Sequence, residues 1–164
     1  MSIPVISTVE TSWDHPDAIA LRAAQRAEIA ERYGTNDSEP GPAPTAADIT
    51  TFFVAYVREA AAAADPAGAG IAVGCGGLRQ LDDNSGEIKR MFVDPSRRGS
   101  GVSVAIVRRL ELAARQRGWS HLLLETGDAQ PDAVRFYTRE GFTPVPNFGH
   151  YVGLEQSLCF GKSL

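Results

Sequence analysis

The sequence is short of cysteine, of positive charge and of long apolar runs. Its 164 residues include only two cysteines, Cys75 and Cys159, too few for a disulfide framework. Both lie in apolar, strand-like segments, so we expect buried free thiols. No apolar run reaches membrane length, and the N-terminus lacks the basic start and apolar core of a signal peptide. We therefore expect a cytoplasmic protein that binds no membrane.

The overall charge excludes another class of partner. A net charge of −4 and a pI near 5.4 argue against a nucleic-acid binder, which needs a strongly basic face. Arginines nevertheless gather locally, and Arg97 and Arg98 flank a glycine turn. This local cluster indicates a specific anionic ligand rather than a polyanionic partner.

Length and hydrophobic periodicity predict one α/β (α+β) domain over residues 1–164. The sheet should be mixed, with helices on both faces, because an antiparallel meander is followed by alternating helices and strands. The alanine-rich stretch 60–70 should connect two strands. Leucine-rich 121–125 is typical of a strand covered on both faces. The predicted strands are 3–9, 49–57, 71–81, 87–93, 121–125, 142–145 and 157–160, and the predicted helices are 14–33, 101–117 and 131–140.

The most informative segment is the turn Arg98-Gly99-Ser100-Gly101-Val102-Ser103, which opens a predicted helix. The first N–H groups of a helix lack intrahelical partners and lie at the positive end of its dipole, so they bind anions. The turn should therefore hold a phosphate-bearing ligand beside a strand end.

Better-known phosphate and metal motifs do not match. A dinucleotide-binding fingerprint needs a third glycine where Val104 stands. The C-terminal Gly161-Lys162-Ser163 lacks the upstream glycine of a P-loop, because Gln156 occupies that position. The histidines and cysteines show no metal-ligand spacing, so no metal is expected.

Two local patterns resemble the GNAT superfamily of acyl-CoA-dependent N-acetyltransferases. The family's Arg/Gln-x-x-Gly-x-Gly/Ala pattern corresponds to 98–103, with Ser103 at the last position. Its Asn-x-x-Ala-hydrophobic-x-Phe-Tyr pattern, followed by Gly-Phe, corresponds to 130–137 and 141–142, with Gln130 in place of Asn. The two patterns stand at the expected separation with a strand between them.

The resemblance implies a fold and a cosubstrate. The fold would be a central, mixed, mostly antiparallel sheet of seven strands, splayed between the fourth and fifth. Acetyl-CoA would lie in the splay, held by backbone amides of a bulge in the fourth strand, by the glycine turn and by the second motif. The implied cofactor-binding residues are Met91, Phe92, Val93, Arg98, Gly99, Ser100, Gly101, Val102, Ser103, Gln130, Ala133 and Phe136.

The resemblance also assigns catalytic roles. Amine acetylation needs a base to deprotonate the amine and a proton for the departing thiolate. Tyr137 is the implied general acid, and its alternative role is packing on the sheet. Glu87 is the leading base, directly or through water, and its alternative is a solvated residue after a turn. Glu125 is the competing base, with a polar strand terminus as its alternative.

The acceptor is least determined by the sequence. The expected acceptor site lies near the end of the first helix and consists of Glu28, Glu31 and Tyr33, together with Glu125 and Tyr151. An aromatic loop that contains Phe148 and His150 could form its second wall. We expect direct acetyl transfer to a small amine or amino-acid-like molecule, without a covalent acyl-enzyme. A peptide or protein amine, or a non-catalytic acyl-CoA-binding module, stays as an alternative. A homodimer could form through the last strands.

Overall fold

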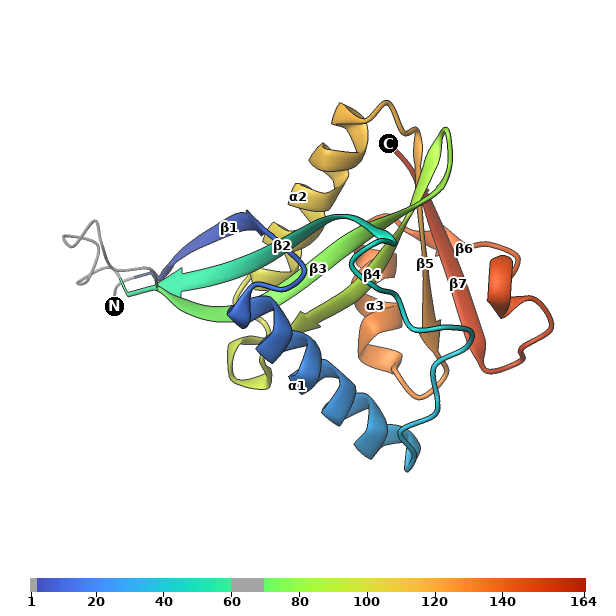
Figure 1. Cartoon of the computed structure of the whole chain (residues 1–164), viewed down its shortest axis with the longest axis horizontal. Helices are drawn as coiled ribbons and strands as arrows, with labels where there is room; N and C mark the ends of the chain where they lie inside the picture. The colour runs from blue at the N-terminus through green and yellow to red at the C-terminus, as the bar shows by residue number, and fades with distance from the viewer. Residues whose placement is uncertain (1–2, 60–69) are drawn as a thin grey trace.

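A seven-stranded mixed sheet organises the chain, and three helices pack on its two faces (Figure 1). The computed structural model describes residues 3–59 and 70–164. The strand order is β1-β2-β3-β4-β5-β7-β6, antiparallel throughout except for the parallel pair β4–β5. The strands are β1 (Val5–Thr11), β2 (Ile49–Arg58), β3 (Ile71–Asp82), β4 (Ser85–Val93), β5 (His121–Gly127), β6 (Thr143–Pro144) and β7 (Ser157–Ser163). This confirms the predicted mixed sheet.

The helices begin and end where the sequence placed their signals. They are α1 (Pro16–Tyr33), α2 (Val102–Gln116) and α3 (Pro131–Arg139), with short 3-10 turns at Pro95–Arg97 and Gly149–Tyr151. His15 caps α1 by accepting a hydrogen bond from the Asp17 amide at 3.1 Å. Gly34 ends the helix with a φ of 68°, a left-handed conformation that glycine adopts without strain. Within the described residues, no helix is long and apolar enough to span a membrane.

The sheet has a hydrophobic core on each face because β2 alternates its side chains. Phe53 and Ala55 point into the larger core with α2 and α3, whereas Phe52 and Val54 face the smaller one under α1. Both cysteines are buried free thiols, as expected. Burial raises the pKa of the Cys75 thiol to about 12, which leaves it unreactive at neutral pH.

One detail differs from the sequence expectations, and another lies outside the described residues. In β5, Leu122 and Leu124 are buried but Leu123 is only partly so, and the strand therefore has one fully covered face rather than two. On the other face Glu125 is also only partly buried, and it borders a pocket described below. The proposed connection over 60–70 falls almost wholly outside the described residues.

A polar network joins α2, α3 and β7. The buried Glu111 carboxylate of α2 accepts hydrogen bonds from Lys162 of β7 at 2.6 Å and from Arg108 at 3.1 Å. Arg108 also donates to Glu140, at the end of α3, at 2.5 Å. The Lys162 ammonium donates to the Glu140 carbonyl at 2.9 Å, which closes the network.

Candidate active site

The parallel strands β4 and β5 separate after a short paired stretch. Their ladder contains only Ser85–Glu87 on β4 opposite His121–Leu123 on β5. Beyond Glu87 the strands diverge in Figure 1, with α3 beside the opening. The expected splay between the fourth and fifth strands is therefore present.

A bulge in β4 lies at the start of this opening. Opposite β3, Cys75 pairs with Phe92 and Gly77 pairs with Lys89, so β4 carries one extra residue there. Arg90 has a φ of 57°, the only positive value at a non-glycine among the described residues. The bulge thus centres on Arg90, one residue before the predicted stretch Met91 to Val93. Such a bulge redirects backbone amides and side chains toward a site.

The glycine turn leaves the start of α2 open. Gly99 and Gly101 have φ values of 75° and 91°, and Gly101 is the N-cap with no side-chain hydrogen bond to the helix end. A Cβ at Gly99 would have no heavy atom within 4 Å, and one at Gly101 would meet only Ile6, at 3.8 Å. The free N–H groups at this end suit an anion such as a pyrophosphate.

Arg98 is held beside the turn by its own contacts. Its guanidinium donates to the Val93 carbonyl at 3.0 Å and to the Glu28 carboxylate at 2.6 Å. Glu28 also pairs with Arg32 at 3.2 Å and does not line the pocket described next. The structure therefore places Glu28 beside the glycine turn rather than with the other expected acceptor residues.

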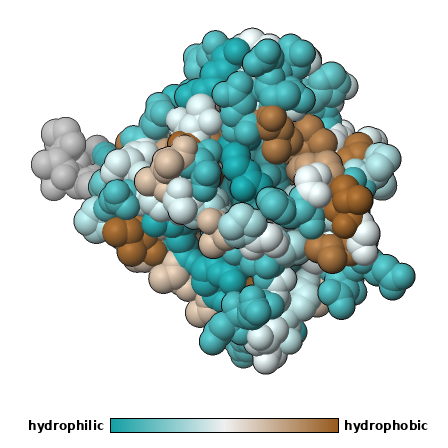
Figure 2. Space-filling model, turned by 45° about the vertical axis from the view of Figure 1, so that its right-hand side comes forward, coloured by the Kyte–Doolittle hydropathy of each residue, from teal (hydrophilic) through white to brown (hydrophobic). Residues whose placement is uncertain are grey.

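A pocket of about 460 Å³ opens where β4 and β5 diverge. It is walled by the end of α1, the loop that follows α1, both splayed strands and the start of α3. Predicted residues Met91, Glu125, Gln130, Ala133, Tyr137 and Tyr33 all line it. Figure 2 shows a face with a hydrophilic band beside separate hydrophobic patches. The lining also includes Gln25, Arg26, Ile29, Thr35, Asp37, Ser38, Glu39, Pro40, Ile88, Lys89, Arg90, Leu124, Thr126, Gly127, Asp128, Leu154, Gln156 and Ser157.

Tyr137 lies in the last turn of α3. Its side chain packs in the larger core and also lines the pocket. The ring makes edge contacts with Phe136 at 5.1 Å and Phe142 at 5.5 Å between centroids. Burial raises the pKa of the Tyr137 hydroxyl, so the hydroxyl holds its proton at neutral pH. The hydroxyl has no hydrogen-bond partner among residues 3–59 and 70–164. The Tyr137 side chain can therefore pack in the core and still contact a ligand in the pocket.

Glu87 is fully buried, which rules out the alternative of a solvated residue after a turn. Its Oε1 accepts from Arg79 at 2.5 Å and its Oε2 accepts from the Tyr151 hydroxyl at 2.6 Å. Tyr151 is itself buried and also accepts from Lys89 at 3.0 Å. Neither Glu87 nor Tyr151 lines the pocket, because they form a buried network behind it.

Glu125 lines the pocket from the β5 side. Burial raises the pKa of this carboxyl, and the Ser157 hydroxyl and nearby Lys89 oppose the rise. A carboxyl with a raised pKa that borders a pocket is a better proton acceptor than one locked in an ion pair.

The remaining expected acceptor residues occupy different places. Tyr33 packs against Gly127 so closely that a Cβ there would lie 1.8 Å from the Tyr33 hydroxyl. That hydroxyl accepts from the Ala129 amide at 3.2 Å. Phe148 packs on Tyr151 at 5.2 Å, and His150 lies against Gly41. The aromatic loop therefore contacts β4 through Tyr151 and the loop after α1 through His150.

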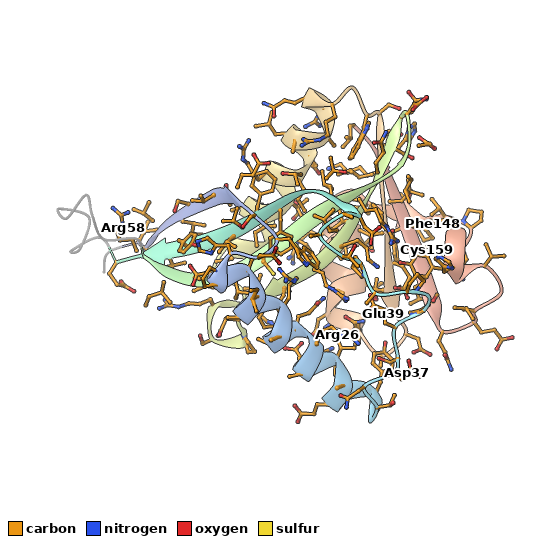
Figure 3. All side chains as sticks on the ribbon, viewed as in Figure 1. Arg26, Asp37, Glu39, Arg58, Phe148 and Cys159 are labelled. Atoms are coloured by element: carbon orange, nitrogen blue, oxygen red, sulfur yellow. The ribbon has the colours of Figure 1, made fainter. Side chains whose placement is uncertain are left out.

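An ion cluster in the pocket wall was not predicted from the sequence. The Glu39 carboxylate, in the loop after α1, meets Arg90 at 2.9 Å, Arg26 at 3.4 Å and Lys89 at 3.8 Å. In Figure 3 the labelled Arg26 of α1 and Glu39 of the loop extend toward the same region. The adjacent basic pair Lys89-Arg90 inside a strand was the one local signal that could have suggested it.

Metal chemistry has no evident centre in the described ranges. Across residues 3–59 and 70–164, no group of three or more His, Cys, Asp or Glu side chains is placed to hold an ion.

Comparison with known proteins agrees with this geometry. Residues 48–144 match the sequence model of the acetyltransferase (GNAT) domain. An IAA acetyltransferase from Azospirillum brasilense is 40% identical over 96 residues, or 58% of this chain, but this match spans only 63% of that relative's length. A solved structure described as an acyl-CoA N-acyltransferase from Klebsiella pneumoniae is 29% identical, with a TM-score of 0.75 over 98% of both chains.

A GNAT-family acetyltransferase from Elizabethkingia anophelis, solved with acetyl-CoA bound, shares the fold. It has a TM-score of 0.63 at 14% identity, over 97% of this chain and 98% of that one. The family domain covers more than half of the chain and includes the splayed strands, the glycine turn and α3. The chain belongs to the GNAT acetyltransferase family.

Proposed function

We propose that this protein transfers an acetyl group from acetyl-CoA to the primary amine of a small amine or amino-acid-like molecule. The observation that carries the proposal is the pocket at the β4–β5 splay, which brings the β4 bulge, Glu125 and Tyr137 to one place. The open N-terminus of α2 follows β4 directly, so one ligand could extend from the turn into the splay.

The chain's residues fit an acyl-CoA in charge and in shape. The N–H groups at the start of α2 would bind the pyrophosphate, and Arg98 adds a positive charge beside them. Glycine or serine at positions 99, 100, 101 and 103 would permit close approach, and Ser103 keeps a small side chain at the position where the family prefers Gly or Ala. Gln130, Ala133 and Phe136 on the α3 side would hold the other flank.

Glu125 is the base that this geometry favours over Glu87. An alkylamine has a pKa of roughly 10, so a base must remove a proton before the nitrogen attacks the thioester carbonyl. Glu125 borders the pocket with a raised pKa, whereas both Glu87 oxygens are engaged by Arg79 and Tyr151. Glu87 would instead fix Lys89 and Tyr151 behind the site.

Tyr137 would give its proton to the departing thiolate. Backbone N–H groups of the bulge at 90–93 would stabilise the oxyanion that forms when the amine adds to the carbonyl carbon and the carbonyl oxygen takes the negative charge. The amine attacks directly, so the reaction needs no nucleophile from the protein. A non-catalytic acyl-CoA-binding module would not need the Tyr137 hydroxyl, and this separates the two functions.

The size of the pocket favours a small acceptor over a protein chain. The loop after α1 forms one wall through Ser38, Glu39 and Pro40, and the pocket volume is about 460 Å³. A peptide amine would require this loop to move aside along its length.

A homodimer through the last strands and a cytoplasmic location stay predictions. Light scattering in solution tests whether the homodimer forms.

The deciding experiment follows thiol release from acetyl-CoA over a library of primary amines and amino acids. We expect thiol release with small acceptors of one chemical class. Calorimetry should show that the protein binds acetyl-CoA more tightly than ATP, another ligand with phosphate groups. Absence of both acetyl-CoA binding and thiol release would refute the proposed function. Binding without release over the whole library would favour the binding-module alternative.

A further inference from the structure

One carboxylate in the pocket wall is held by three basic side chains from two elements. Glu39 Oε2 lies 2.9 Å from Arg90 and 3.4 Å from Arg26, while Oε1 lies 3.8 Å from Lys89. The Glu39 side chain is 15% exposed and that of Arg90 is 9% exposed. The cluster is therefore largely shielded from water, where charge pairing matters most.

The three cations do not depend equally on Glu39. Lys89 also lies 3.9 Å from Glu87 and donates to Tyr151 at 3.0 Å. Arg26 has one further bond, to the Asn36 carbonyl at 3.3 Å. Within the described part of the chain, Arg90 has no other carboxylate partner. Two guanidinium groups would thus face the pocket without an anion if the loop carrying Glu39 moved.

Other polar groups beside the cluster also lack partners. Gln25 Oε1 and Ser38 Oγ are buried without a hydrogen bond in the described ranges, and both residues line the pocket. Leaving such atoms without a hydrogen-bond partner is costly. A polar ligand entering here could satisfy them.

We propose that the acceptor carries a carboxylate as well as its amine, and that Arg26 and Arg90 bind this carboxylate in the place that Glu39 holds here. The inference rests on the proposed acetyl transfer. A planar guanidinium matches a carboxylate with two parallel hydrogen bonds, so a substrate carboxylate can replace that of Glu39 at little cost. Glu39 is then an internal competitor that closes the loop until the acceptor displaces it.

The charges of the pocket select against a simple cationic amine. With Glu39 in place its charge is already compensated by three cations, and with Glu39 displaced the cations would repel an ammonium group. Glu125, on the opposite strand of the splay, is the anionic group that remains for the amine end. The favoured acceptor is therefore an amino acid or another amine with a nearby carboxylate.

The test compares acceptors matched in all but the carboxylate. Each amino acid is assayed beside its carboxamide and its decarboxylated amine, by thiol release from acetyl-CoA with the full chain. We expect kcat/KM for the acids to exceed that for both analogues by about tenfold or more, the usual scale for a charge-assisted hydrogen bond. The Arg26→Gln variant should lose this preference mainly through KM, with little change toward the carboxamides.

Glu39→Gln should act in the opposite direction. Removing the internal competitor lowers KM for the acids by about threefold to tenfold and lowers KM for the carboxamides by less, because only the acids gain the freed guanidinium groups. Asp83→Asn, in the exposed turn between β3 and β4, removes one negative charge far from the pocket and serves as the control. Arg90→Asn is the second variant. Asn is chosen because it tolerates the positive φ that Arg90 has at the bulge.

Two results would overturn the proposal while leaving acetyl transfer intact. One is equal use of acids and carboxamides by the wild-type chain. The other is an equal loss toward both classes in Arg26→Gln. If no amine supports thiol release, the proposed function fails, and the carboxylate site is judged separately by thermal shift. A rise in Tm with amino acids but not with their carboxamides, absent in Arg26→Gln, would then support it, and no difference would refute it.

Discussion

Replacing Tyr137 by Phe separates chemistry from packing at one side chain. The ring is 6% exposed and its edge contacts with Phe136 and Phe142 do not involve the hydroxyl. Phe keeps these contacts. Because the hydroxyl has no partner in the described residues, its removal breaks no hydrogen bond inside the folded protein. The free energy of unfolding should therefore change by no more than about 0.5 kcal/mol.

The effect on turnover should be far larger. Loss of a general acid slows the chemical step by about 10²-fold or more, which corresponds to at least ~2.7 kcal/mol of transition-state stabilisation. Acetyl-CoA affinity should stay within a few-fold, since the ring and backbone are unchanged. Burial raises the pKa of Tyr137, so the hydroxyl stays protonated over the usual assay range. The ratio of wild-type to variant rates should thus be nearly constant from neutral to mildly alkaline pH.

The assay combines steady-state thiol release, calorimetry with acetyl-CoA and thermal unfolding. Tyr56→Phe is the matched control, because its hydroxyl donates to Asp17 at 2.7 Å, away from the pocket. This control should lose about 1 to 3 kcal/mol of stability and keep its turnover. Unchanged turnover in Tyr137→Phe would refute the acid role, and a comparable loss in Tyr56→Phe would show that the assay reports folding.

Two further predictions concern the base and the turn. Glu125→Gln should lower kcat/KM by about 10²-fold and remove its decline as pH falls through the raised pKa of this carboxyl. A carboxyl whose pKa is higher in the folded than in the unfolded protein destabilises the fold when it is ionised, at pH values above its unfolded pKa. Glu125→Gln should therefore raise Tm at neutral pH but not in acid. A lower Tm at neutral pH would contradict this. Gly101→Ala should cost about 1 to 2 kcal/mol, because alanine is strained at its φ of 91°, and should raise KM for acetyl-CoA. Gly118→Ala, at a φ of 78° with nothing within 4 Å, should cost the same stability without changing that KM, and equal KM values in the two variants would count against a cofactor turn.

Local patterns predicted the elements and the cofactor side of the site. Glycines at 99 and 101 mark the start of α2, and the Phe136-Tyr137 pair marks α3, because turn chemistry and helix ends depend on neighbouring residues. The family resemblance added the splay, which no local pattern encodes. The fold was therefore predictable almost throughout.

The acceptor side depends on contacts between distant segments. Glu87 meets Tyr151 across 64 positions of sequence, and Arg90 meets Glu39 across 51. No periodicity or turn preference relates such residues, so the sequence could not distinguish a buried, paired Glu87 from an exposed base. The Glu39 cluster was missed for the same reason.

The network of Glu111, Arg108, Lys162 and Glu140 makes the two sides of the pocket unequal in stiffness. It links α2, the end of α3 and β7 to one another through hydrogen bonds to Glu111 and Glu140, whose side chains are buried. On the other side, the direct hydrogen bond from α1 to β4 in the described residues is long, at 3.4 Å from Gln25 to the Met91 carbonyl, and Arg26 and Arg90 are linked only through Glu39 of the loop. We therefore expect the motions that admit an acceptor to involve the loop after α1 more than the segments that hold Tyr137.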